Sequence, residues 1–305
     1  MIYLLENNCW NPAQVEGIDK SSQAAAVIRV SEIKKFDTLL PVNFELVKSI
    51  LASKTFSFDR QENIDYMGFL YLNHKKISGS TEKMVICVSH NLLVFIHDSA
   101  DHMESMVLEL ISEANDSQKS LGLLMCNFME RLVEGHIKLH ENIEDEISNL
   151  ENSFLTSARK QGPGEILILR KRLIILKRYY EQLQNILDDI QENEYSLIDE
   201  HSMRYFTVYT RRIERLYQNI LILRDNVTQV RESYEAETGI KLNNIMRIFT
   251  VVTVIFLPLT LIAGWYGMNL QMPEFGWIWS YPVVILVCIA VVVFSVIYFK
   301  KNKWF

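Results

Sequence analysis

The sequence predicts an α+β membrane protein, in which an N-terminal cytoplasmic α/β domain is followed by long cytoplasmic helices and two C-terminal transmembrane helices. Three observations support this fold class. Short β-rich runs and helical patterns fill the first third of the chain. Apolar residues then recur at helical spacing through the middle. Finally, no charged residue occurs at 248–273 or at 275–299, two stretches of 26 and 25 residues.

The α/β domain is expected over residues 1–117. Apolar and β-branched runs predict strands at 25–30, 66–72, 84–88 and 92–96, and the last two are expected to form a hairpin around the polar break at 89–91. Helical spacing predicts helices at 42–51 and 101–114, the second with Asp98 or Ser99 as its N-cap.

The long cytoplasmic helices are expected over residues 118–242. Their spacing predicts helices at 118–160 and 165–193, separated by Gly162-Pro163-Gly164, and a third helix that starts near 203. Acidic residues at 141–146 and basic residues at 170–178 suggest that the first two pair in antiparallel fashion. Gly239 is a weak breaker that costs about 1 kcal/mol. The third helix is therefore expected to continue through the first apolar stretch to about Gly264, a length of about 90 Å.

The two apolar stretches predict membrane spans at 243–266 and 281–299, since a span needs about 20 apolar residues. Basic residues flank both spans on one side, whereas the connecting segment 267–280 has none. Both chain ends, including the basic tail 300–305, are therefore expected in the cytoplasm, with the protein in the cell (inner) membrane. Aromatic residues gather at the opposite boundary, as expected at a membrane interface.

One face of the first span carries its polar groups. A seam with alternating spacings of three and four contains all three threonines of this span. Its members are Asn243, Met246, Thr250, Thr253, Leu257, Thr260, Gly264 and Gly267. The stripe fits helix packing, for which small and hydroxyl residues are typical, and it fits the lining of a pore. Two spans cannot enclose a water-filled path alone, so pore lining implies a homo-oligomer.

The end of the first span carries a motif with a specific placement. Tyr266-Gly267-Met268-Asn269 is followed by Met272-Pro273-Glu274-Phe275, then by Tyr281-Pro282, the second span and Lys300-Lys301-Asn302-Lys303-Trp304. Over at least residues 118–305 this arrangement resembles the CorA family of magnesium channels.

The resemblance implies a funnel-shaped homopentamer in the lipid bilayer, with the first span lining the pore and the second packed outside it. Gly267, Met268 and Asn269 would form the selectivity filter, where neutral oxygens bind the water shell of Mg2+, an ion that dehydrates reluctantly. An ungapped alignment on this motif places the following residues at pore positions of the family: Asn243, Met246, Phe249, Leu257 and Thr260. Phe249 departs from the seam.

The resemblance also implies regulation by the transported ion. In the family, intracellular Mg2+ bridges acidic residues of neighbouring subunits and holds the channel closed. Glu232 aligns with one such position, where the family has Asp, and Asp225 is a further candidate. Apart from the resemblance, Glu274 is a candidate for attracting cations at the outer mouth, or a lone loop carboxylate without a role. Lys300, Lys301 and Lys303 are first a topology signal and second a candidate basic collar at the inner mouth.

The sequence leaves other functions open. A zinc or other divalent-cation transporter of the same superfamily remains an alternative, and so does a non-conducting membrane-anchored coiled-coil scaffold; Co2+ and Ni2+ are further candidate ions. His97, Asp98, Asp101, His102 and Glu104 fit a metal site less well than a solvated helix start. The net charge of −6 disfavours nucleic acid. No phosphate-binding loop or catalytic constellation occurs, so neither an organic cofactor nor an enzyme is expected.

Overall fold

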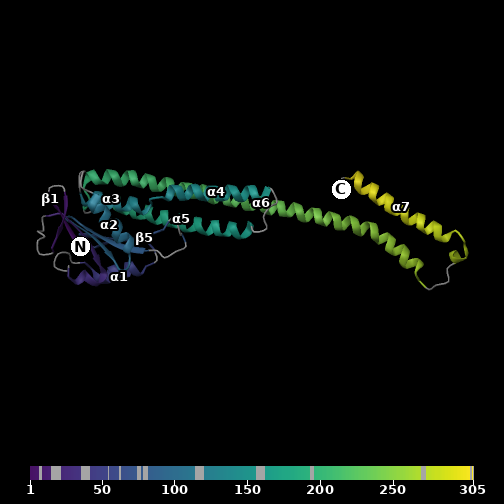
Figure 1. The fold of residues 1–305 in the computed structure, drawn as a ribbon, viewed down its shortest axis with the longest axis horizontal. Helices are drawn as coiled ribbons and strands as arrows, with labels where there is room; N and C mark the ends of the chain where they lie inside the picture. Colours follow the sequence, from purple (N-terminus) through teal and green to yellow (C-terminus); the bar gives the residue numbers. More distant parts are fainter. Residues whose placement is uncertain are drawn as a thin grey trace. The chain divides into compact units, whose positions relative to one another are not determined.

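The computed structural model describes residues 1–6, 9–14, 22–35, 42–53, 55–61, 63–73, 77, 82–113, 120–155, 162–192, 196–268, 273–302 and 304. These residues form two compact units, Met1–Val230 and Arg231–Phe305. The division falls within one helix, α6 (Glu200–Tyr266), which appears in green in Figure 1.

A mixed sheet of seven described strands forms the centre of the first unit (Figure 1). The strands are β1 (Ile2–Glu6), β2 (Cys9–Ala13), β3 (Ala24–Arg29), β4 (Ser57–Gln61), β5 (Ile64–Tyr71), β6 (Glu82–Ser89) and β7 (Leu92–His97). Their order is β2-β1-β3-β7-β6-β5-β4. Strands β3 and β7 pair in parallel, and all other neighbours are antiparallel. The hairpin expected at 84–96 is confirmed, with Ser89 opposite Leu92.

Three strands, β1, β2 and β4, were not predicted. Strands β2 and β4 are the two edges of the sheet. The first contains Pro12, which is tolerated at an edge, and the second, Ser57–Gln61, is mostly polar and only half-buried. Edge strands need not present an apolar face to the core, so the usual strand signal is weak there.

Helices cover both faces of the sheet. Helix α1 (Phe44–Ala52) packs on one face, where Val47 and Ile50 join a buried cluster with residues of β3, β6 and β7. Helices α2 (Asp101–Glu113) and α3 (Leu121–Leu132) lie on the other face (Figure 1). There Phe128 of α3 contacts the rings of Phe69 and Phe95, with centroids 6.0 and 5.3 Å away. Aromatic contacts thus bind α3 to the sheet.

The N-terminus of α2 differs from expectation. Neither Asp98 nor Ser99 caps it, because the first helical hydrogen bond runs from the Glu104 amide to the Ala100 carbonyl. Two free amides of the first turn bond to side chains of the sheet instead. The Ala100 amide donates to His97 Nδ1 at 3.3 Å, and the Met103 amide donates to a Glu82 carboxylate oxygen at 3.0 Å.

The single helix expected at 118–160 is also wrong. The chain forms α3 and then α4 (His136–Leu155), with a turn at 133–135 between them. Gly135 has a φ of 77°, a conformation that glycine adopts without steric cost. The turn lets α3 stay on the sheet while α4 joins the long helices.

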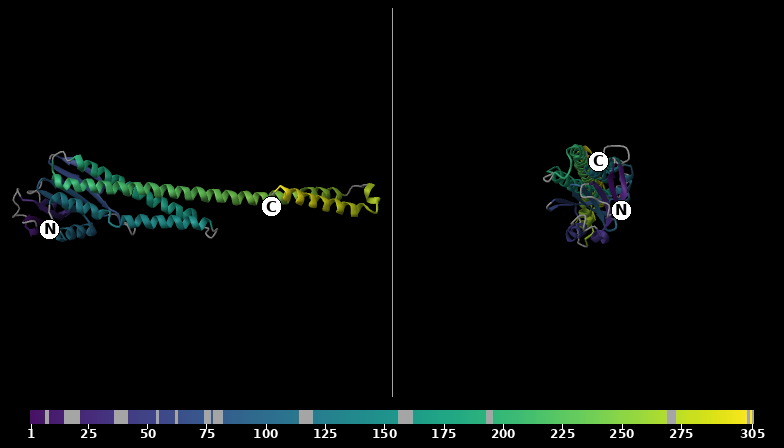
Figure 2. Two further views of the ribbon diagram at one scale, coloured as in Figure 1. Left: turned by 90° about the horizontal axis from the view of Figure 1, so that it is seen from above. Right: turned by 90° about the vertical axis from the view of Figure 1, so that its left-hand side faces the viewer.

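Helices α4, α5 (Gly162–Glu192) and the first part of α6 lie side by side in the first unit (Figures 1 and 2). Helix α5 begins at Gly162, earlier than the expected 165, since Pro163 is tolerated in a first helical turn. Asp199 caps α6 by accepting a hydrogen bond from the Ser202 amide at 2.8 Å. The expected continuation of this helix through Gly239 is confirmed, and Pro258 does not end it.

The second unit contains the end of α6, a short 3-10 helix (Pro273–Gly276) and α7 (Ser280–Lys301). Helices α6 and α7 are both long and apolar enough to cross a membrane. They run antiparallel, as Figure 2 shows, because Trp304, after the end of α7, lies beside Arg247 of α6. Val251 and Phe299 are the two fully buried residues among the described part of this unit.

Candidate ion pathway

The seam residues lie on one continuous helix. From Asn243 to Gly264 they all belong to α6, and in the single chain all of them are exposed. Gly267 follows directly after the last helical residue, Tyr266. Within the described part of the chain, the expected pore-lining groups are thus exposed along a single helix.

The opposite face of α6 packs against α7. Val251 is buried, and Ile255, Pro258 and Ile262 are half-buried, so they form a stripe of their own. At 3.6 residues per turn this stripe lies roughly 160° around the helix from the centre of the seam. From residue 284 onward, the covered or partly covered positions of α7 are Val284, Cys288, Val291, Val292, Ser295 and Phe299. Helix α7 therefore occupies one side of α6 and leaves the polar side open.

The three threonine hydroxyls of the seam bond within the helix. Each donates to the carbonyl four residues earlier: Thr250 to Met246, Thr253 to Phe249 and Thr260 to Phe256, at 2.8, 2.8 and 2.9 Å. A hydroxyl whose proton is used in this way presents only its oxygen lone pairs outward. Such oxygens suit the water shell of a cation, whose protons point away from the ion.

A hollow of about 860 Å³ lies along the upper part of the seam. Its lining residues are Val252, Thr253, Phe256, Leu257, Thr260, Leu261, Gly264, Trp265 and Met268. Phe249, which fell outside the seam, adjoins it in the structure: it is 64% exposed and lies one turn before Thr253. The heptad seam excludes Phe249 and the ungapped family alignment includes it. The two placements thus differ only by a rotation about the helix axis.

The first two residues of the expected filter, Gly267 and Met268, follow the end of α6. The Gly267 amide donates to the Ala263 carbonyl at 2.9 Å, and the Met268 amide donates to the Trp265 carbonyl at 3.4 Å. A Cβ atom on residue 267 would lie 2.9 Å from the same Ala263 carbonyl oxygen, so the turn is tight enough to require glycine. The C-terminal end of a helix carries a partial negative charge, which favours a cation at this position.

Several expected site residues lie outside the part of the chain that the structure describes. These are Asn269, Lys303 and the side chain of Glu274. Lys300 and Lys301, by contrast, are exposed at the end of α7.

The two candidate regulatory carboxylates share a face of α6. Asp225 and Glu232 are seven residues, or about 10 Å, apart along the helix and both are exposed. Asp225 lies 3.7 Å from the Arg224 guanidinium. Among the described residues, no group of three or more His, Cys, Asp or Glu side chains forms a metal site.

The acidic and histidine residues near 97–104 form a helix start instead of a metal site. His97 is buried, and burial lowers its pKa despite the nearby Glu104 carboxylate, 3.4 Å from Nε2. Arg29 lies 3.8 Å from Asp101 and 3.7 Å from Glu104. Arg29 thus offsets the carboxylates of this segment, and the His97 imidazole accepts a hydrogen bond from the Ala100 amide.

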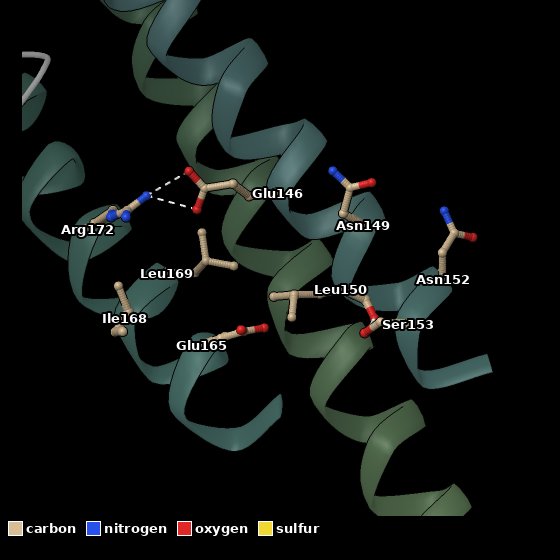
Figure 3. Close-up of a pocket in the computed structure, with 9 residues that line it drawn as sticks. All are labelled: Glu146, Asn149, Leu150, Asn152, Ser153, Glu165, Ile168, Leu169 and Arg172. Atoms are coloured by element: carbon tan, nitrogen blue, oxygen red, sulfur yellow. Dashed lines mark hydrogen bonds and ion pairs between the residues drawn. The ribbon is translucent and has the colours of Figure 1, made fainter. Parts of the chain in front are cut away.

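A second hollow, of about 650 Å³, lies between α4 and α5 in the first unit (Figure 3). Glu146 and Arg172 stand across it, with both carboxylate oxygens 2.9 Å from the guanidinium. This pair supports the expected antiparallel match of acidic and basic helix faces. The Arg172 guanidinium thus neutralises the Glu146 carboxylate in this hollow.

Comparison with known proteins adds the family relationship. The family described as CorA-like Mg2+ transporter protein matches residues 31–301. The chain is 34% identical over 189 residues to the cobalt/magnesium transport protein CorA of Thermotoga maritima, covering 61% of this chain and 54% of that protein. It is 25% identical over 324 residues to the magnesium transport protein CorA of Blochmanniella floridana, covering 99% of each. The matched part thus spans about half of the first relative.

The fold is also that of a solved structure. The complete CorA magnesium transporter of Methanocaldococcus jannaschii superposes with a TM-score of 0.82 at 18% identity, covering 100% of this chain and 98% of that one. The α/β domain, the long helix and the two apolar helices therefore form one known architecture.

Proposed function

The chain belongs to the family of CorA-like Mg2+ transporters, and from this premise we propose that it is a channel for passive Mg2+ uptake across the cell membrane. In this proposal it forms a homopentamer, with α6 of each subunit around a central pore. Both chain ends face the cytoplasm, in keeping with the basic residues at the inner ends of both spans.

One observation carries the proposal: the hydroxyl stripe of α6 and its α7-facing stripe lie on nearly opposite sides of the helix. A helix that used its threonines to pack within the chain would turn them toward α7. Here they face away from it, which is the orientation that a pore-lining helix needs.

The chemistry of the pathway suits a hydrated ion. Carbonyl and amide oxygens of Gly267, Met268 and Asn269 would meet the water shell of Mg2+ at the entrance without removing it. Threonine oxygens continue the path inward. The side chains of Leu257, Phe249 and Met246, repeated in each subunit around the pore axis, would constrict the path. A hydrophobic constriction closes a pore by excluding water.

The membrane potential supplies the driving force. A divalent ion moving inward gains about 4.6 kcal/mol per 100 mV, which is twice the value for a single charge. Such a gradient would overload the cell if the pore stayed open. We infer that intracellular Mg2+ closes the channel by binding Glu232 and Asp225 together with oxygen ligands of a neighbouring subunit.

Flux into proteoliposomes tests the proposal. We expect Asn269→Ala to reduce Mg2+ uptake by at least about tenfold, because each subunit loses an amide oxygen from the entrance, and tenfold corresponds to about 1.4 kcal/mol. The control is Asn244→Ala, the same change on the α7-facing side of α6. Equal flux in wild type and Asn269→Ala would contradict the assignment of the filter.

The same assay separates the alternatives. Co2+, Ni2+ and Zn2+ replace Mg2+ in parallel experiments, with and without a proton gradient. Zinc flux above magnesium flux would make the chain a zinc transporter. A purified oligomer that conducts none of these ions would instead be a membrane-anchored scaffold.

A further inference from the structure

The inner ends of the two spans are joined by a contact that the transport mechanism above does not use. The Arg247 guanidinium lies over the ring of Trp304, 5.7 Å from its centroid, within the range of a cation–π interaction. Arg247 is one turn before buried Val251 and one turn after Asn243, so it lies on α6 between the α7-facing stripe and the seam.

Trp304 is held in place by Phe299 of α7. Its ring packs on Phe299 with centroids 5.4 Å apart, and its amide donates to the Phe299 carbonyl at 3.0 Å. Phe299 itself is only 5% exposed. The residue after the lysine cluster thus folds back on the end of α7 and presents its face to α6.

Arg247 has no carboxylate nearby in the sequence. The chain contains no Asp or Glu between Glu237 and Glu274, and Glu237 itself lies 2.9 Å from Lys241. In the described part of the second unit, the partner shown for Arg247 is the indole ring. Both side chains are exposed, with Trp304 36% accessible, so the pair is a surface cation–π contact of modest strength.

We propose that Trp304 is a positioning residue, which holds the inner end of the pore helix α6 against α7 through Arg247. We call the Arg247–Trp304 contact the latch. It makes the two spans move as one body. A movement of α6 that began in the stalk would then carry α7 with it, or would have to break this contact.

A thermal-unfolding cycle on the purified full chain tests the latch without reference to transport. We expect Arg247→Gln and Trp304→Ala each to lower the melting temperature by about 2–4 °C, with the double variant no lower than Trp304→Ala alone. Trp304→Phe should restore more stability than Trp304→Leu, since only the ring attracts a cation. As a control, Lys241→Gln should combine additively with Trp304→Ala.

Additive losses for Arg247→Gln and Trp304→Ala, or equal rescue by Leu and Phe, would overturn the latch. If Trp304→Ala fails to fold, the comparison of Arg247→Lys with Arg247→Gln, each in the Trp304→Phe background, carries the same test. There a loss in Arg247→Gln that Arg247→Lys does not share supports the latch, and equal stability overturns it.

The positioning role has a second readout, which rests on the proposed Mg2+ flux. Arg247→Gln and Trp304→Ala should change the internal Mg2+ concentration that halves the flux by about threefold or more, whereas Trp304→Phe should stay near wild type. An unchanged concentration would limit Trp304 to stability alone. Absence of flux in the wild type would refute the channel but leave the unfolding cycle intact.

Discussion

At the scale of single residues, a buried pair of histidines gives the first unit a defined response to acid. His136 Nδ1 and His140 Nε2, one turn apart on α4, lie 2.8 and 2.9 Å from the Tyr180 hydroxyl of α5. All three side chains are buried. The hydroxyl can donate to one neutral imidazole and accept from the other, whereas two protonated imidazoles would leave its own proton without an acceptor.

Burial lowers the pKa of His140 from 6.5 to about 4. The unfolded chain therefore binds a proton below pH 6.5 that the folded chain does not accept until about pH 4. Stability is present above pH 6.5 and is lost as pH falls toward 4, by up to about 3 kcal/mol. We expect the free energy of unfolding, measured by chemical denaturation, to differ less between pH 4.5 and pH 7.5 for His140→Gln than for wild type.

The control for this experiment is His201→Gln, because His201 is exposed at the start of α6. The difference in unfolding free energy between pH 4.5 and pH 7.5 should be the same for His201→Gln as for wild type. If His140→Gln retained the full difference, other groups would account for the acid sensitivity.

At the scale of elements, the two faces of α6 differ: one carries the threonine seam and the other faces α7. Helical spacing alone identified the threonine seam but left helix packing and pore lining equally possible. The packing of α7 on Val251, Ile255, Pro258 and Ile262 favours pore lining, since it occupies the other side. Pro258 lacks an amide proton, and the structure places it on the protein-covered face.

A matched pair of substitutions tests the role of the hydroxyl stripe. Thr253→Val keeps the side-chain shape and removes the outward oxygen, so we expect Mg2+ flux to fall by about tenfold. Thr238→Val removes an equivalent hydroxyl, which donates to the Tyr234 carbonyl at 2.8 Å before the span. Flux measurements should show wild-type rates for Thr238→Val. Equal rates for both variants would argue that the stripe serves helix packing only.

At the scale of the whole molecule, the proposed regulation depends on contacts between subunits. Among the residues described, one chain brings no cluster of metal ligands together, and Glu232 and Asp225 are exposed on α6. Exposed carboxylates bind a divalent ion weakly unless further oxygen ligands complete the shell. Closure by Mg2+ would therefore report on assembly as well as on ion concentration.

We expect Glu232→Gln to raise the internal Mg2+ concentration that halves the flux by about tenfold, because one charged ligand per site is lost. The assay is uptake into proteoliposomes with internal Mg2+ varied. Glu237→Gln, on the far side of the same helix, should leave the response unchanged. An inhibition curve of Glu232→Gln that overlays the wild type would remove Glu232 from the regulatory site.

Local patterns in the sequence determined much of this architecture. Uncharged stretches located both spans, heptad-like spacing located the seam, and the break at 89–91 located the β6–β7 hairpin. These features depend on residues within a few positions of each other, so periodicity is enough to find them. The sequence did not predict the separation of α3 from α4, because a single glycine, Gly135, interrupts an otherwise continuous helical pattern.

Only the tertiary structure decided the features that join distant parts of the chain. The parallel pairing of β3 with β7, the meeting of His140 with Tyr180 and the contact of Arg247 with Trp304 link residues far apart in sequence. No local pattern specifies such pairs, because they follow from which faces remain uncovered once the elements have packed. For the same reason, the sequence by itself could find the polar stripe of α6, but only the position of α7 decided that it faces outward.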